Sequence, residues 1–215
     1  MRRACDRFPL LYHKIPLLAT GWEEYIRFFH RTHGSCHCLT HAENSTLASA
    51  LYLIDGELCG NKGYYLFAAA TFKSYRGKGC MAKLLEKAKQ FAMENSKSFI
   101  ALVPAEKSLF GYYSGFGYKT AFYATKQDVK NIAEIKPDSR FIWCREHTDY
   151  IRAEHEKYGT DIFEYDGGLY SVFDGGFIKT PAPMCEENRY GMLLPLNEDA
   201  EYLTNRNLYI GLTME

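Results

Sequence analysis

The segment 71–81 (TFKSYRGKGCM) places two glycines among basic side chains, between an apolar run and a strongly patterned stretch. The apolar run predicts a strand, and the patterned stretch predicts a helix. Glycines let successive backbone N–H groups turn toward one anion, and a helix N-terminus adds a favourable dipole. Lys73, Arg76, Lys78 and Lys83 add positive charge nearby. The sequence therefore predicts an anion-binding loop that suits a phosphate.

Other interpretations of this loop differ in how well they fit. A plain strand-to-helix turn with exposed basic residues stays open. A P-loop is excluded, because no Gly-Lys-Ser or Gly-Lys-Thr follows four residues after a first glycine. Gly77, Gly79 and Ala82 fit the G-x-G-x-x-A fingerprint of dinucleotide-binding folds. That fingerprint normally follows the first strand of a parallel sheet, whereas short turns here join several antiparallel strands before the loop.

Hydrophobic periodicity around the loop predicts a mixed α/β fold. Short turns at Asp55-Gly56 and at 60–63 indicate that the first three strands pair antiparallel. Two aromatic-Asp-Gly-Gly turns, at 165–168 and 173–176, indicate a three-stranded meander. A more polar composition beyond about 125 places a soft boundary near Asp128, giving units 1–127 and 128–215. The expected helices are 22–30, 79–95, 106–113 and 145–158, and the other expected strands are 36–41, 47–54, 64–71, 99–103, 118–124, 192–196 and 208–214.

Composition excludes several function classes. The 215 residues include 26 Lys plus Arg and 26 Asp plus Glu, so no net field attracts nucleic acid or a membrane surface. The longest uncharged apolar stretch, 64–72 (YYLFAAATF), is far shorter than the about 20 residues of a membrane helix. Asp6 and Arg7 interrupt any signal-peptide core, and the 7 scattered cysteines are typical of reduced thiols. We therefore expect a cytoplasmic protein without nucleic-acid or membrane partners.

A second cluster of chemically capable side chains lies at 33–41 (HGSCHCLTH), which contains five potential zinc ligands. On a strand, Cys36 and Cys38 share one face while His37 and His41 share the other. Four ligands then cannot converge without a loop, so the sequence favours a plain strand and no metal. A zinc-binding interaction module remains a minor alternative.

Two motifs resemble the GNAT superfamily of acyl-CoA-dependent N-acyltransferases, over about residues 22–124. The segment 76–81 (RGKGCM) is similar to the family's [Q/R]-x-x-G-x-[G/A] loop, which wraps the pyrophosphate of coenzyme A, although Met81 replaces the usual Gly or Ala. The segment 103–118 (VPAEKSLFGYYSGFGY) resembles the family's V-x-P-x-N-x-x-A-x-x-[FY]-Y-x-x-x-G-[FY] motif, with Glu106 in place of Asn. Both motifs stand in the family's order, separated by one helix and one strand.

The resemblance implies a mixed, mostly antiparallel sheet flanked by helices, with an appended C-terminal α+β half similar to degenerate repeats of the fold. It implies direct transfer of an acetyl group from acetyl-CoA to a primary amine of a small-molecule or peptide acceptor. Tyr113 takes the position of the family's general acid, which protonates the leaving thiolate, although a packed aromatic is the competing interpretation. The cofactor-binding positions that it implies are Ala69, Ala70, Thr71, Arg76, Gly77, Lys78, Gly79, Cys80 and Met81.

The general base is not evident, because 64–71 carries no Asp, Glu or His. Some members that resemble this chain place a terminal carboxylate in the active site, which makes Glu215 a hypothesis. The missing base, Met81 and Glu106 also keep open a catalytically silent acyl-CoA-binding or regulatory module. For the C-terminal half three roles stay open: covering the acceptor cleft, supplying the base, or forming a homodimer surface.

Overall fold

The computed structural model describes residues 22–34, 36–129, 138–159, 161–165, 168–173 and 177–212. The helices are α1 (Trp22–Thr32), α2 (Cys80–Glu94), α3 (Ser108–Ser114), α4 (Arg145–Tyr158) and α5 (Glu198–Glu201), with 3-10 turns η3 (Lys73–Tyr75), η5 (Glu186–Asn188) and η6 (Tyr202–Asn205). The first strands are β1 (His37–Glu43), β2 (Thr46–Leu58), β3 (Asn61–Thr71), β4 (Phe99–Leu102) and β5 (Lys119–Asp128). The later strands are β6 (Ser139–Arg140), β7 (Ile142–Trp143), β8 (Asp161–Tyr165), β9 (Gly168–Phe173), β10 (Phe177–Pro181), β11 (Arg189–Pro195) and β12 (Leu208–Tyr209). No described helix has both the length and the apolar character needed to cross a membrane.

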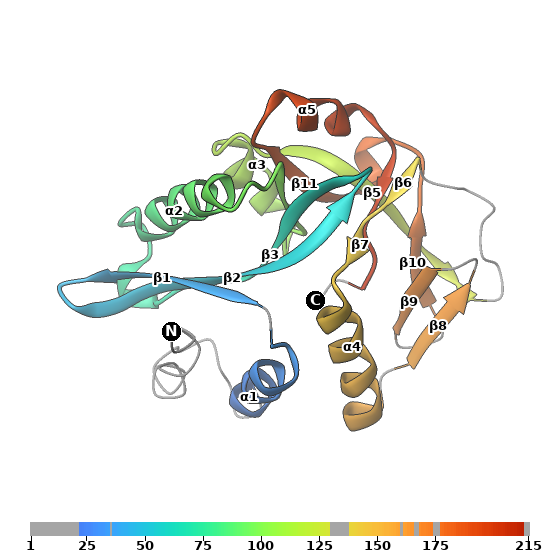
Figure 1. The fold of residues 1–215 in the computed structure, drawn as a ribbon, viewed down its shortest axis with the longest axis horizontal. Helices are drawn as coiled ribbons and strands as arrows, with labels where there is room; N and C mark the ends of the chain where they lie inside the picture. The colour runs from blue at the N-terminus through green and yellow to red at the C-terminus, as the bar shows by residue number, and fades with distance from the viewer. Residues whose placement is uncertain are drawn as a thin grey trace.

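The strands form one twisted sheet in the order β1-β2-β3-β4-β11-β5-β10-β9-β8, with β6, β7 and β12 paired beside this path (Figure 1). Most neighbours are antiparallel, but β3 and β4 are parallel and α2 connects them. A parallel pair needs such a crossover, which explains why the strongest helix lies between these strands. The expected mixed, mostly antiparallel sheet flanked by helices is confirmed.

Backbone pairing crosses residue 128. β11 lies between β4 and β5, and β10 pairs with the other edge of β5. The expected meander is confirmed, because β8, β9 and β10 pair antiparallel in sequence. The division into units 1–127 and 128–215 stays a prediction about independent folding, while the sheet itself uses strands from both ranges.

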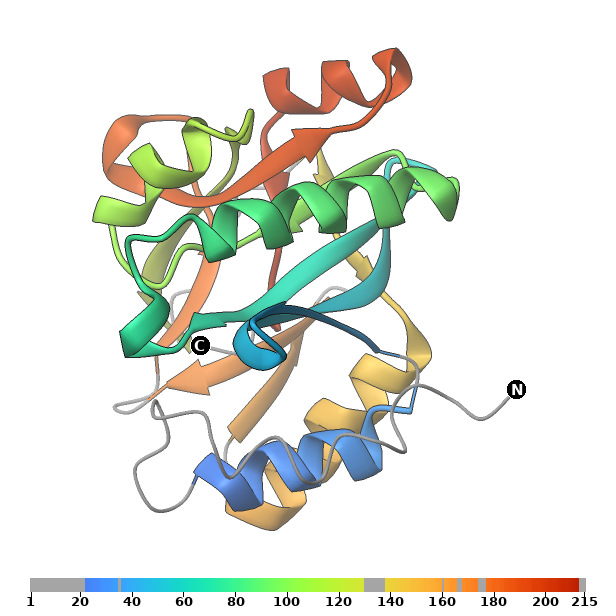
Figure 2. The same cartoon turned by 90° about the vertical axis from the view of Figure 1, so that its left-hand side faces the viewer.

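Helices cover the two faces of the sheet. α2 packs over β1, β2, β3 and β4, whereas α1 and α4 lie side by side against the opposite face (Figure 2). Alternating residues of β2 and β3 supply the two cores, because successive side chains of a strand point to opposite faces. Leu51, Leu53, Tyr64 and Leu66 enter the core beneath α2. The core beneath α1 and α4 receives Tyr52, Ile54, Tyr65 and Phe67.

The last strand is shorter than the sequence suggests. β12 covers only Leu208–Tyr209 of the expected 208–214, and 213–215 lie outside the described residues. The Gly211 carbonyl accepts a hydrogen bond from Trp143 Nε1 at 2.7 Å, and the Leu212 carbonyl bonds His147 Nε2 at 3.0 Å. Side chains thus bond the backbone carbonyls that a neighbouring strand would otherwise bond. Leu212 also has a left-handed φ of 56°, which ends the extended conformation.

Two histidines meet where α1 and α4 approach one another. The ring centroids of His33 and His147 are 5.5 Å apart, and the side chains are 1% and 0% exposed. Neither ring nitrogen of His33 has a hydrogen-bond partner among the described residues. Burial lowers the pKa of His33 to about 4 and that of His147 to about 3.

This pair predicts acid sensitivity of the fold. In the unfolded chain both histidines titrate near about 6.5, so between roughly pH 6.5 and 4 the unfolded state binds more protons. The free energy of unfolding is therefore retained above that window and falls as pH drops through it, by up to about 1.4 kcal/mol per pH unit for each histidine. We expect His33→Leu to flatten this dependence in urea titrations between pH 7 and 5. Parallel curves for the variant and the wild type would contradict this origin.

Candidate functional site

β3 and β4 separate partway along their length. Their parallel register covers Gly63–Phe99, Tyr64–Ile100 and Tyr65–Ala101, and β3 then continues to Thr71 while β4 ends at Leu102. A cavity of about 460 Å³ opens at this fork, lined by residues of both strands, of the connection to α3, and of β10 and β11. Strand edges carry backbone donors and acceptors, so an extended ligand can pair with β3 at the fork.

A β-bulge shapes the β3 side of the fork. The β2–β3 register shifts between Ala50 and Tyr52, and Ala68 has a φ of 51°. Strict alternation would send Ala69 to the face of Phe67, yet Ala69 packs against the core beneath α2. The extra residue bends the strand at this point, and both Ala68 and Ala69 line the cavity. The small side chains at 68–70 leave this stretch accessible.

A second cavity of about 490 Å³ adjoins the first, between the loop before α2, the first turn of α2, and α3. Ala69, Leu109 and Tyr113 line both cavities, so the two lie next to each other. The predicted binding residues that line the second are Ala69, Thr71, Arg76, Gly77, Gly79, Cys80 and Met81. Of the other two, Ala70 pairs with Ala50 on β2, and Lys78 extends over the ring of Tyr75, 5.4 Å from its centroid.

The loop conformation depends on its glycines. Gly77 and Gly79 have φ of 74° and 76°, a region that L side chains rarely adopt, and a Cβ at either would meet nothing within 4 Å. These two glycines are therefore needed for the backbone conformation of the loop and not to make room for a neighbouring atom. Gly79 caps α2 without a side-chain hydrogen bond, and Cys80, Met81 and Ala82 of the first turn line the cavity. The first amides of a helix have no partner within the helix, so they are available to an anion there. Arg76 Nε donates to the Thr71 carbonyl at 3.2 Å and ties the loop to the end of β3.

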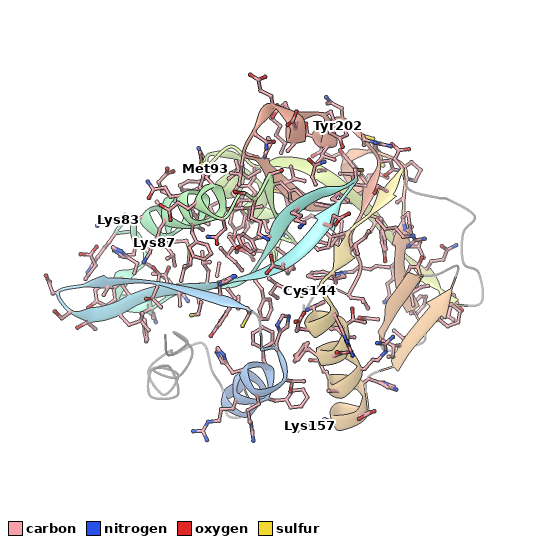
Figure 3. The ribbon with its side chains drawn as sticks, viewed as in Figure 1. Lys83, Lys87, Met93, Cys144, Lys157 and Tyr202 are labelled. Atoms are coloured by element: carbon pink, nitrogen blue, oxygen red, sulfur yellow. The ribbon has the colours of Figure 1, made fainter. Side chains whose placement is uncertain are left out.

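Lys83, one of the four basic residues that the sequence places near the loop, forms an ion pair with Glu43 on β1. Its ammonium lies 2.7 Å from Glu43 Oε1, and Lys87 donates to the Thr40 carbonyl at 3.2 Å. Figure 3 shows both lysines on the side of α2 that faces β1. Hydrogen bonds from Lys83 and His41 lower the pKa of Glu43 to about 2. These lysines tie α2 to the edge strand of the sheet.

Among the described residues, the histidines and cysteines of 33–41 do not form one group of ligands; His41 lies instead with Glu43 and Cys80, whose potential ligand atoms are within 4.8 Å of one another. Cys36 and Cys38 belong to the core beneath α1 and α4. On the opposite face the His37 ring packs against Tyr64 and Phe91, with centroids 5.5 and 5.1 Å away. The predicted strand is confirmed as β1.

Tyr113 lies on α3 at the junction of the two cavities. Its side chain is 8% exposed and packs edge-on against Tyr112 and Tyr118, with ring centroids 5.4 and 5.7 Å away. Burial, with a smaller contribution from Tyr112, raises its pKa to about 12. The phenol therefore stays protonated at neutral pH and borders the space where a ligand would bind.

Sequence reasoning missed the far wall of the first cavity. Lys179 on β10, with Arg189 and Tyr190 on β11, lines it opposite β3. No local motif marks these residues, because only the pairing of β11 with β4 and β5 brings them to the fork. Glu106 also lines this cavity, and its replacement of the family's Asn was a signal. Glu215 lies outside the described residues, so its role stays a hypothesis.

Comparison with known proteins agrees with this architecture. The structure is similar to that of a GCN5-related N-acetyltransferase from Kribbella flavida, with 14% identity and a TM-score of 0.54, over 87% of this chain and 69% of that one. It also matches the IAA acetyltransferase from Bacillus cereus, with 13% identity and a TM-score of 0.47, over 91% of this chain and 97% of that one. A GNAT family acetyltransferase from Elizabethkingia anophelis, solved with acetyl-CoA bound, gives 9% identity and a TM-score of 0.44, over 85% and 89%.

No curated protein sequence matches the chain significantly. The model of the Acetyltransferase (GNAT) family matches residues 5–118, which is more than half of the chain and includes the loop, α2, β4 and α3. The chain therefore belongs to the GNAT family of acetyltransferases.

Proposed function

We propose that the protein transfers the acetyl group of acetyl-CoA to a primary amine by direct attack. One observation carries the proposal: the glycine-containing loop and the forked sheet border two adjoining cavities, and Tyr113 lines both. The loop suits a pyrophosphate, and the fork suits the extended arm that follows it. The reacting thioester then lies beside the bulge of β3.

Different groups of the chain bind different parts of acetyl-CoA. The loop amides and the N-terminus of α2 bind the pyrophosphate, with Arg76 and Lys78 adding charge. The β3 edge pairs with the pantetheine arm as a neighbouring strand would. Backbone N–H groups at the bulge stabilise the charge that develops on the thioester oxygen.

Two side chains move the protons. As the amine nitrogen bonds to the acyl carbon and the C–S bond breaks, Tyr113 donates its proton to the departing sulfur. Among the described residues that line either cavity, Glu106 is the only one with a carboxylate. We therefore assign Glu106 as the base that removes the proton of the attacking amine, directly or through water. Its Oε1 accepts a hydrogen bond from Ser108 Oγ at 2.6 Å, which orients the carboxylate.

The cofactor site is tested by reversing its charge. We expect Arg76→Glu with Lys78→Glu to weaken acetyl-CoA binding at least about tenfold, because both side chains would then repel the pyrophosphate. Isothermal titration measures the affinity. The matched control is Lys62→Glu with Lys126→Glu, which changes the net charge equally at exposed positions outside both cavities. Folded wild-type protein that does not bind acetyl-CoA would contradict the proposal.

Removing the Tyr113 hydroxyl tests the general acid. We expect Tyr113→Phe to lower kcat by about 100-fold with little change in acetyl-CoA affinity, since the ring packing is kept. Tyr118→Phe is the control, because that hydroxyl is buried with no hydrogen-bond partner among the described residues and its loss should be silent. Equal kcat for the Tyr113 variant and the wild type would leave Tyr113 as a packed aromatic.

Glu106→Gln tests the base. The amide keeps the size of the side chain but cannot take a proton, so we expect kcat to fall at least about 100-fold in steady-state assays. Acetyl-CoA titration of the same variant should give the wild-type affinity. Acetyl-CoA binding by the wild type without turnover of any amine in a broad panel would instead favour the catalytically silent module.

A further inference from the structure

The first cavity has an excess of positive charge on the side away from the pyrophosphate loop. Its described lining contains the cations Lys107, Lys179 and Arg189 against the single carboxylate of Glu106. No residue of the segment 71–82 lines this cavity, whereas that segment lines the second one. The residues that carry these cations therefore line the cavity at the fork and not the cavity at the loop.

Lys179 and Arg189 come from the two strands that flank β5. Arg189 is in register with Tyr123, and Lys179 is in register with Lys126, so both cations are fixed by pairing to the same strand. The Tyr209 hydroxyl donates to the Lys179 carbonyl at 2.5 Å and fixes the backbone further. Both charges thus lie on sheet strands rather than on loops, which favours a defined geometry.

Aromatic rings hold both cations against the cavity wall. Lys179 Nζ lies 4.5 Å from the ring centroid of Tyr190, and the Arg189 guanidinium carbon lies 5.2 Å from that of Phe110. Arg189 also contacts Glu186 at 2.5 Å, but Glu186 is 79% exposed and does not line the cavity. A guanidinium has five N–H donors, so this one surface pair leaves donors for a ligand.

The remaining wall is apolar and aromatic. Its members are Tyr65, Phe67, Val103, Phe110 and Tyr190, which offer apolar surface to a hydrophobic body. Arginine matches a carboxylate in planar, two-point geometry, and lysine adds a compact second charge. The wall therefore suits an amine that has both an anionic group and an apolar side chain.

We propose that the acetyl acceptor is a carboxylate-bearing amine of the amino-acid class with an apolar or aromatic side chain, whose carboxylate is bound by Arg189 and Lys179. This inference rests on the proposed function, because the amine must meet the thioester at the same fork. On this proposal, β10 and β11 determine the specificity for the acceptor, whereas the loop and α2 bind the cofactor.

Matched product pairs test the inference without needing turnover. N-acetyl-L-phenylalanine and N-acetylphenethylamine differ only by the carboxylate, and each is titrated into protein saturated with coenzyme A. We expect the carboxylate compound to bind at least about tenfold more tightly, as a charge-assisted pair predicts. The double variant Lys179→Gln with Arg189→Gln should remove that difference, and Lys126→Gln, which alters the lysine paired with Lys179, should preserve it.

The possible results distinguish a failure of the acceptor assignment from a failure of the proposed function. Equal binding of the two compounds, or binding of neither, by a wild type that binds acetyl-CoA would overturn the acceptor assignment and leave the proposed function standing. Loss of coenzyme A affinity in the double variant, as large as the loss for the carboxylate compound, would also overturn it by assigning the cations to the cofactor. A wild type that does not bind acetyl-CoA would reject the proposed function itself.

Discussion

The parting of β3 from β4 is the constraint on which the rest of the structure depends. Backbone donors and acceptors in a sheet need partners, and the parallel register ends at Tyr65–Ala101. The same residues of β4 pair with β3 on one edge and with β11 on the other, and the fork opens because β4 ends at Leu102 while β3 continues to Thr71. The β3 edge beyond Tyr65 is therefore available to a ligand.

The long connection between β5 and β11 brings residues from later in the chain to the cavity at the fork of β3 and β4. The chain leaves β5 at Asp128 and returns at Arg189, and the segment between builds α4 and the β8–β10 meander. The meander pairs onto β5, which brings Lys179 to the wall of the cavity that β3 and β4 open. The loop to which we assign the cofactor is local in sequence, whereas the wall that we propose for the acceptor depends on contacts between distant strands.

That difference also explains what the sequence could and could not predict. The helix Arg145–Tyr158 and the loop before α2 follow from local periodicity and glycine chemistry, and both were expected with nearly the observed bounds. The insertion of β11 between β4 and β5 has no local signal, so Arg189 and Lys179 were not found. The strand expected at 208–214 was too long because the carbonyls of Gly211 and Leu212 bond Trp143 and His147, which no local pattern reveals.

At Tyr113, aromatic packing is compatible with the proposed proton donation, because the packing fixes the position of the hydroxyl. The rings of Tyr112 and Tyr118 hold the side chain edge-on and restrict its position. The same burial raises its pKa to about 12, which keeps the phenol protonated at neutral pH. A thiol has a pKa of about 8.5, below that of this phenol, so the raised pKa keeps the donor protonated but does not drive the transfer. What the packing contributes to the proposed step is the fixed position of the hydroxyl beside the cavities. In the proposed mechanism, the aromatic cluster of α3 therefore positions the acid as well as forming part of the core.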